Sequence, residues 1–444
     1  MADGSDTMDI FERVREQFNY APYPATPLDY FPKNDSNMQF PYCAANAFYR
    51  RDGRYVPSEG LQILDAGCGS GVTTLRLCLA NPGAQITAID LSPASVAVAR
   101  ERLDKYGYTD VALYAMPLEQ LSELGQTFDY IHCHETLYLL PDPQAGLQSM
   151  AAVLSERGVI RANLHSKYQR HEYFRAQELF AYLGATTDCD QETAVAIATE
   201  TLDALAETTQ LHARTWRGKE GREKDTLLAN HILEGDKGFT ILDLFDLLRG
   251  AELDLIDMVN WRHWNVRNLF KPGQDLPDYL QVAFESATPE QLLHTFELLH
   301  PVHRLLDFWC GRAEVPSSYS SAGDRPPTDW ETATIYLQPV LRTEKFRAAL
   351  DQTVAHGLTL DMRPFLGCTD PQSLTLFANS LLIFHLLWQE PMTFVALRQL
   401  WQRLHPIDPL TLAPTTLEAC GEALRLMLPD LEDYLFIMIE FGVG

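Results

Sequence analysis

Three glycines follow a short apolar run in the stretch ILDAGCGSG: Gly67, Gly69 and Gly71. A loop without side chains at these positions lets its backbone approach a ligand closely. Two acidic residues accompany the loop, since Asp65 precedes the first glycine and Asp90 ends the next apolar run. A carboxylate at such a strand end can accept both hydrogens of a ribose diol. The glycine spacing differs from the dinucleotide fingerprint G-x-G-x-x-G, so the pattern predicts a different nucleoside ligand.

A second group of polar residues lies in and after the apolar run FDYIHC and comprises His132, His134, Glu135 and Tyr138. Alternation along a strand puts His132 and His134 on one face and Cys133 on the other. Because neighbouring side chains diverge and the sequence has no second cluster of ligating residues, we predict no metal site. We expect His134, Glu135 and Tyr138 to line a substrate pocket and to act in catalysis. The alternative is that they are ordinary polar residues at a strand end.

The elements that must position these residues alternate between strand and helix. Short apolar runs are separated by helical patterns, for example after Ser92 and Pro93, which favour an N-cap and a first helical position. Strand–helix alternation at this spacing predicts a doubly wound α/β sheet with right-handed crossovers, with ligands beyond the carboxyl ends of the strands. The expected strands cover residues 61–68, 85–91, 111–116, 128–134 and 158–165.

The sequence pattern changes several times along the chain. Prolines in NYAPYPATPLDYFPKN forbid a regular helix near the N-terminus. Helical patterns at 166–237 interrupt the alternation of strands and helices. The stretch DYLQVAF at 278–284 is expected to be the last strand of the sheet. The histidines of LLHPVHRLLDFWCG are expected on an apolar helical face. The predicted segments are an N-terminal cap segment (1–48), the first part of the core (49–165), a helical insertion (166–237), the end of the core (238–285) and a mostly helical C-terminal domain (286–444).

Four stretches, LDAGCGSG, ITAIDLS, FDYIHC and RGVI, resemble the successive motifs of class I S-adenosylmethionine-dependent methyltransferases. The resemblance covers about 61–165 and the helix–strand unit 240–261. It implies a Rossmann-like seven-stranded methyltransferase sheet, methyl transfer as the activity and S-adenosylmethionine as the cofactor. The cofactor-binding residues that the resemblance implies are Asp65, Gly67, Gly69, Gly71, Asp90, Leu91, Met116, Pro117 and His132.

Within that resemblance the residues have different expected roles. The glycines would approach the methionine part of the cofactor, Asp65 would orient the loop from beneath, Asp90 would bind the ribose and Leu91 would pack on the adenine. The family often has an acidic residue contacting the adenine amino group after the third strand. Met116 stands there in this sequence, so a carboxylate contact is absent.

The methyl acceptor is not evident from these motifs. The chain is much longer than a small-molecule enzyme needs, and its layout is similar to bacterial lysine methyltransferases with a C-terminal regulatory domain and to phycobiliprotein asparagine N-methyltransferases. We therefore expect N-methylation of a protein side chain, asparagine or lysine. The alternatives are a small-molecule N-, O- or C-methyltransferase and a cofactor-binding protein without catalysis.

Composition limits the partners and the compartment. Lys and Arg number 35 against 60 Asp and Glu, a net charge of −25 that argues against nucleic acid as a substrate. The eight cysteines include no C-x-x-C pair, which is typical of reduced thiols. No apolar run approaches the roughly 20 residues of a membrane span, and the acidic N-terminus does not resemble a signal peptide. We expect a cytoplasmic protein that binds no membrane, and the sequence leaves open whether it forms a homodimer.

Overall fold

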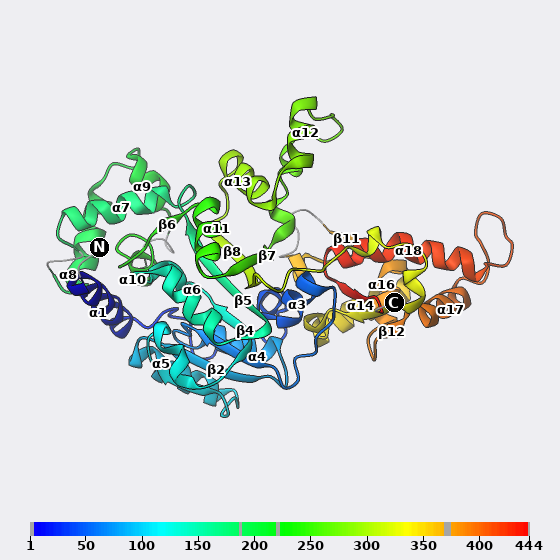
Figure 1. Ribbon diagram of the computed structural model, residues 1–444, viewed down its shortest axis with the longest axis horizontal. Helices are drawn as coiled ribbons and strands as arrows, with labels where there is room; N and C mark the ends of the chain where they lie inside the picture. Colours follow the sequence, from blue (N-terminus) through cyan, green and yellow to red (C-terminus); the bar gives the residue numbers. More distant parts are fainter. Residues whose placement is uncertain (1–3, 186–188, 219–222, 368–373, 443–444) are drawn as a thin grey trace. The chain divides into compact units, whose positions relative to one another are not determined.

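The computed structural model describes residues 4–185, 189–218, 223–367 and 374–442. The chain forms two compact units, and each is built from segments that are separate in the sequence (Figure 1). The first unit comprises Met1–Tyr30, Gly60–Cys78 and Ala84–Val315, and the second comprises Phe31–Glu59, Leu79–Gly83 and Pro316–Gly444.

The first unit contains a mixed sheet whose main path has the order β3-β2-β1-β4-β5-β8-β7, with β6 pairing beside β5. The strands from β3 to β5 are parallel, whereas β8 runs antiparallel to both β5 and β7. The strand order reverses between β1 and β4, which is where open α/β sheets bind ligands. This arrangement confirms the predicted Rossmann-like fold. The strands are β1 (Gln62–Ala66), β2 (Gln85–Asp90), β3 (Ala112–Ala115), β4 (Phe128–Cys133), β5 (Leu154–Ser166), β6 (Gly238–Phe239), β7 (Leu253–Met258) and β8 (Leu305–Arg312).

Two helices of the core begin at capping residues, and the sequence predicts the first of them, Ser92. Ser92 accepts a hydrogen bond from the Ser95 amide at the start of α5, and Thr240 forms a capping box with Asp243 at the start of α11. These caps satisfy amides that the first helical turn leaves without a partner. The helices of the core and of the N-terminus are α1 (Gly4–Tyr20), α4 (Val72–Ala80), α5 (Pro93–Lys105), α6 (Pro143–Ala152), α11 (Ile241–Gly250), α12 (Asp278–Ser286) and α13 (Pro289–Leu299).

The last strand lies later in the chain than expected. The prediction of a strand at 278–284 is wrong, because these residues form α12, in which Leu280 and Phe284 lie one turn apart and pack on the core. The stretch expected as an apolar helical face supplies β8 instead. Its residues from Phe308 to Cys310 are fully buried in succession, as in a strand covered on both faces.

The segment predicted as a helical insertion folds as four helices among its described residues. They enclose a small core of their own that includes Phe180, Trp216 and Leu227. Gln17 of α1 donates to the Ile232 carbonyl at 3.3 Å and accepts from the Glu234 amide at 3.2 Å, which joins the N-terminal helix to the insertion. The helices are α7 (His171–Tyr182), α8 (Gln191–Ala204), α9 (Gln210–Thr215) and α10 (Lys224–Leu228).

The second unit is mostly helical around short antiparallel strands. One sheet has the order β12-β9-β13, and β10 pairs with β11. The buried Tyr49 hydroxyl donates to Glu432 at 2.8 Å, which connects α3 with α18. Its strands are β9 (Thr334–Leu337), β10 (Thr359–Asp361), β11 (Thr375–Phe377), β12 (Met392–Thr393) and β13 (Ile437–Glu440). Its helices are α2 (Ser36–Gln39), α3 (Ala44–Asp52), α14 (Glu344–His356), α15 (Arg363–Leu366), α16 (Ala378–Leu386), α17 (Phe394–Leu404) and α18 (Leu417–Asp433). Across the described residues, no helix combines the length and apolar character that a membrane crossing requires.

Arg102 of α5 ties the proline-rich N-terminal segment to the glycine loop. Its buried guanidinium donates to the Ser70 carbonyl at 2.9 Å, to Pro27 at 2.9 Å and to Thr26 at 2.6 Å. A charged donor that satisfies three carbonyls at once stabilises the segment against local opening.

Replacing this arginine should release the segment. We expect Arg102→Met to speed chymotrypsin cleavage after Tyr20, which is part-exposed, by about tenfold or more, because losing these bonds makes local opening easier. Mass spectrometry of the fragments measures the rate. Lys105→Met on the same helix, at an exposed position, is the control. Equal cleavage rates in the two variants would contradict the tether.

Candidate functional site

The glycine loop after β1 is held in a left-handed conformation and in close contact with the rest of the chain. Gly67, Gly69 and Gly71 have φ of 92°, 50° and 80°. A Cβ atom at Gly67 would lie 2.0 Å from Thr136 Oγ1, and one at Gly69 would lie 2.2 Å from the Tyr23 carbonyl oxygen. A residue with a Cβ would clash at Gly67 and Gly69, so the loop presents backbone, and not side chains, at the end of the sheet.

Asp90 lies at the carboxyl end of β2, beside this loop. Its Oδ2 accepts from the Gly69 amide at 2.8 Å and its Oδ1 from the Ser92 amide at 2.8 Å. A carboxylate has about four acceptor sites, so each oxygen keeps one for a further donor. Two half-buried apolar residues lie next to Asp90 along the backbone: Leu91 follows it in the chain, and the Met116 amide donates to the Asp90 carbonyl at 2.9 Å. Two acceptors beside apolar side chains fit a ribose diol with its attached base, so the residues present fit S-adenosylmethionine.

Asp65 lies beneath the loop with no exposed surface. Its Oδ2 accepts from the hydroxyls of Thr73 at 2.8 Å and Thr74 at 2.7 Å, both at the start of α4. Burial raises the pKa of Asp65 to about 6, against the lowering effect of the two hydroxyls. The carboxylate thus joins the end of β1 to the following helix and shapes the loop from within.

His132 lies on β4 beside Asp65 and is fully buried. Its Nδ1 is 3.3 Å from Asp65 Oδ1, and its Nε2 accepts from Arg161 Nη1 at 3.1 Å. Burial, with Arg161 nearby, lowers the pKa of the ring well below its usual value. A ring without exposed surface has no face to offer a ligand, and its contact with Asp65 links His132 to the glycine loop.

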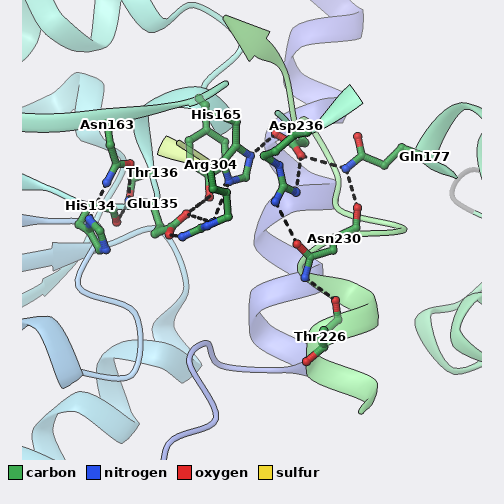
Figure 2. A network of polar contacts seen from close by, with 12 residues as sticks. His134, Glu135, Thr136, Asn163, His165, Gln177, Thr226, Asn230, Asp236 and Arg304 are labelled. Carbon is green, nitrogen blue, oxygen red and sulfur yellow. Dashed lines mark hydrogen bonds and ion pairs between the residues drawn. The ribbon is translucent and has the colours of Figure 1, made fainter. Parts of the chain in front are cut away.

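The other polar residues of this region come together at the carboxyl ends of β4 and β5, as Figure 2 shows. Asn163 of β5 donates from Nδ2 to His134 Nδ1 at 2.5 Å and accepts the Glu135 amide at 2.9 Å. Glu135 has φ of 57°, which is uncommon for a residue with a side chain and is often found at functional sites. Burial, together with Arg161, lowers the pKa of His134 to about 4, so this ring is a neutral hydrogen-bonding group at pH 7.

The Glu135 carboxylate is the centre of the cluster. The Tyr138 hydroxyl donates to Oε2 at 2.5 Å, Arg304 Nη1 donates to the same oxygen at 3.2 Å, and Arg304 Nη2 donates to Oε1. Burial opposes ionisation of Glu135, but the charge and hydrogen bonds of Arg304 favour the carboxylate, and the pKa of Glu135 lies well below the usual range. Burial and the Glu135 charge raise the pKa of Tyr138 well above its usual value, so Tyr138 remains protonated.

Buried polar contacts continue from this cluster into the insertion. His165 Nε2 accepts from Arg304 at 3.2 Å, and His165 Nδ1 donates to Asp236 at 2.7 Å. The fully buried Asp236 side chain also accepts from Arg170 at 3.3 Å and Gln177 at 2.9 Å, both in or next to α7 (Figure 2). The insertion is therefore connected to Glu135 through a continuous series of hydrogen bonds.

Sequence reasoning missed the partners of Glu135. One signal was available, because Asn163 and His165 alternate at the end of the strand that neighbours FDYIHC and so share a face. Arg304 and Asp236 gave no such signal, since each lies outside the recognisable motifs. Pro117, predicted as a cofactor contact, is half-buried just after β3. In the part of the chain that the structure describes, no three His, Cys, Asp or Glu side chains are grouped so that they could hold a metal.

Comparison with known proteins identifies the class. Residues 57–226 match the family model of a methyltransferase domain. A Ubiquinone biosynthesis O-methyltransferase of Xylella fastidiosa is 39% identical over 104 residues, which cover 23% of this chain and 41% of that protein. The chain therefore contains a methyltransferase domain, its sheet has the class I methyltransferase fold, and such a domain indicates S-adenosylmethionine as the methyl donor.

Two further proteins are similar over most of the chain. Protein syc1184_c of Synechococcus sp., named as uncharacterized, is 28% identical over 320 residues, 71% of this chain and 75% of that protein. PKMT2 from Rickettsia typhi has the same fold with a TM-score of 0.55 at 14% identity, covering 94% of this chain and 77% of that one. PKMT2 has also been solved in complex with AdoHcy, S-adenosylhomocysteine.

We expect the carboxylate of Asp90 to make cofactor affinity depend on pH. Burial raises the pKa of Asp90 to about 6, although amide donors oppose the shift. Because the ribose hydroxyls donate to the ionised form, affinity should be constant above about pH 7 and be lost as the pH falls through 6. We expect the Kd for S-adenosylhomocysteine, measured by calorimetry, to rise about tenfold between about pH 7 and pH 5.

Asp90→Asn tests the assignment of this titration. The amide cannot ionise, so the variant should bind more weakly at neutral pH and should show a nearly flat profile. Asp65 also has a pKa of about 6 but is fully buried beneath the loop. A pH dependence that survives in Asp90→Asn would assign the titration to another group and contradict the prediction.

Proposed function

We propose that this methyltransferase N-methylates a protein side chain, asparagine or lysine. The observation that carries the proposal is the amount of folded chain beyond the cofactor-binding sheet. The insertion has its own apolar core, and the second unit adds Pro316–Gly444 together with two earlier segments. Methyl transfer from a sulfonium needs mainly proximity and orientation. Surfaces of this extent suit the docking of a macromolecule better than the enclosure of a small one.

The likeness to known proteins supports the same choice. Similarity to the ubiquinone O-methyltransferase is confined to 23% of the chain, the share expected for the cofactor-binding part alone. The likeness in fold to PKMT2 extends over 94% of the chain. A small-molecule methyltransferase is the second candidate, and the 39% identity to the O-methyltransferase favours it.

Residues of this chain would hold the cofactor in defined ways. Asp90 would accept the ribose hydroxyls, Leu91, Met116 and Pro117 would flank the adenine, and the glycine loop would approach the methionine part. When bound, S-adenosylmethionine supplies a methyl group on a positively charged sulfur. His134, Glu135 and Tyr138 would line the acceptor side, because Thr136 between them packs directly on Gly67.

Transfer of a labelled methyl group tests the proposal. Purified protein is incubated with methyl-labelled S-adenosylmethionine and a lysate separated by size. We expect label in a discrete protein band, and none with Asp90→Ala, because that variant lacks the ribose acceptor. Asp104→Ala, an exposed acid on α5, is the matched control and should behave as the wild type. Label confined to the small-molecule fraction would contradict the proposal and favour the second candidate.

A further inference from the structure

Arg304 and Glu135 form a pair with unused hydrogen-bonding capacity at the acceptor side. A guanidinium has five N–H groups. Two on Nη1 donate to Glu135 Oε2 and His165 Nε2, and one on Nη2 donates to Glu135 Oε1. The second Nη2–H and the Nε–H lie along one edge of the guanidinium and have no acceptor among the residues that the structure describes. The Arg304 side chain is 45% exposed, so a ligand from solvent can reach this side chain.

Glu135 offers a hydrogen-bond acceptor next to the Arg304 guanidinium. Its Oε2 is occupied by Tyr138 and Arg304, whereas among the described residues its Oε1 accepts from Arg304 Nη2 alone. An ionised carboxylate oxygen has two acceptor sites, so Oε1 keeps one. The Glu135 side chain is 19% exposed. The pair therefore presents two donors and one acceptor side by side.

Three features hold this pair in place. Glu135 has its strained backbone fixed by the Asn163 side chain, and Arg304 is held from behind by His165, whose ring is itself fixed by Asp236. Tyr138 stacks on His165 with ring centroids 3.6 Å apart. A preorganised pair loses little side-chain freedom when it binds a ligand.

The pair also lies next to the cofactor loop. Thr136, which follows Glu135, packs against Gly67. Tyr23 accepts the Ser70 amide at 3.0 Å through its carbonyl, and the Glu135 charge, after burial, raises the pKa of its phenol. Tyr23 therefore spans the distance between the glycine loop and Glu135.

The charges of the pair select among acceptors. The carboxylate and the guanidinium neutralise each other, so a lysine ammonium would meet a cation and gain little from a carboxylate that is already paired. An anionic acceptor would be repelled by the Glu135 carboxylate and would gain little from a guanidinium that is already paired. A carboxamide is neutral and carries one oxygen that accepts and one nitrogen that donates, which complements the open edge of Arg304 and the free site of Oε1.

We infer that Glu135 and Arg304 bind a carboxamide, and that the methyl acceptor is an amide side chain and not lysine. This inference rests on the proposed function. Arg304 would donate to the amide oxygen and stabilise the negative charge that develops there as the nitrogen becomes nucleophilic. The new C–N bond forms as the S–C bond breaks with its electron pair on sulfur. The departing N–H proton passes through Glu135 to water.

The chemistry of the labelled protein tests the acceptor class. After acid hydrolysis of the labelled band, an N-methylated amide releases its label as volatile methylamine, whereas methyl-lysine keeps the label in the amino acid. Recovery as methylamine is the expected result. Label in methyl-lysine would overturn the inference but leave the proposed function standing. Absence of label from every protein would instead contradict the proposed function, and the binding experiment below would then decide the inference by itself.

A binding experiment tests the two residues without the natural acceptor. Saturation-transfer NMR is recorded on the protein loaded with S-adenosylhomocysteine, with N-acetyl-asparagine methylamide and N-acetyl-lysine methylamide as probes. We expect the asparagine probe to bind and the lysine probe not to bind. Arg304→Gln and Arg304→Lys should each weaken the asparagine probe about tenfold, because lysine keeps the charge but lacks the edge with two donors.

Matched controls separate binding from folding. Arg249→Gln removes an exposed arginine that pairs with Glu290 in the same way, and it should leave probe binding unchanged. The Kd for S-adenosylhomocysteine should be the same in all variants, which shows that the sheet is intact. Full binding by Arg304→Lys would show that charge alone matters, and equal binding of the two probes would show no amide selectivity. Either result would overturn the inference.

Discussion

The contact between Gly67 and Thr136 is the constraint on which the site depends. Only a residue without a Cβ leaves room for the threonine side chain, and only a left-handed backbone gives the loop its course. This contact brings the loop after β1 against the loop after β4. The carboxylate of Asp90, which we propose binds the cofactor, and the polar cluster around Glu135 thereby come to one end of the sheet, at the reversal of strand order.

Buried charge organises the acceptor side. Two ion pairs, Glu135 with Arg304 and Asp236 with Arg170, are joined by His165, which accepts from one pair and donates to the other. Removing Arg304 or Arg170 would leave a buried carboxylate without its cation, which is much more costly than losing an exposed pair. The insertion contributes both Arg170 and Asp236, so its folding and the placement of Glu135 are interdependent.

The sequence predicted the parallel part of the sheet and the positions of Asp65 and Asp90, because strand alternation, helix caps and glycine spacing are local signals. It did not predict β8, since a fully buried strand has no alternation and its apolar run also fits a helix. Arg304 and Asp236 became part of the site only through strand pairing and the return of the chain from the insertion. The contribution of Phe31–Glu59 to the second unit likewise depends on long-range packing.

The most direct test of this account is a crystal structure of the protein with S-adenosylhomocysteine. The account predicts that the ribose hydroxyls donate to Asp90, that the adenine lies between Leu91 and Met116, and that the sulfur faces the side of the loop where Thr136, Glu135 and Arg304 lie. A ribose held by other residues, or a sulfur directed away from Glu135, would contradict it.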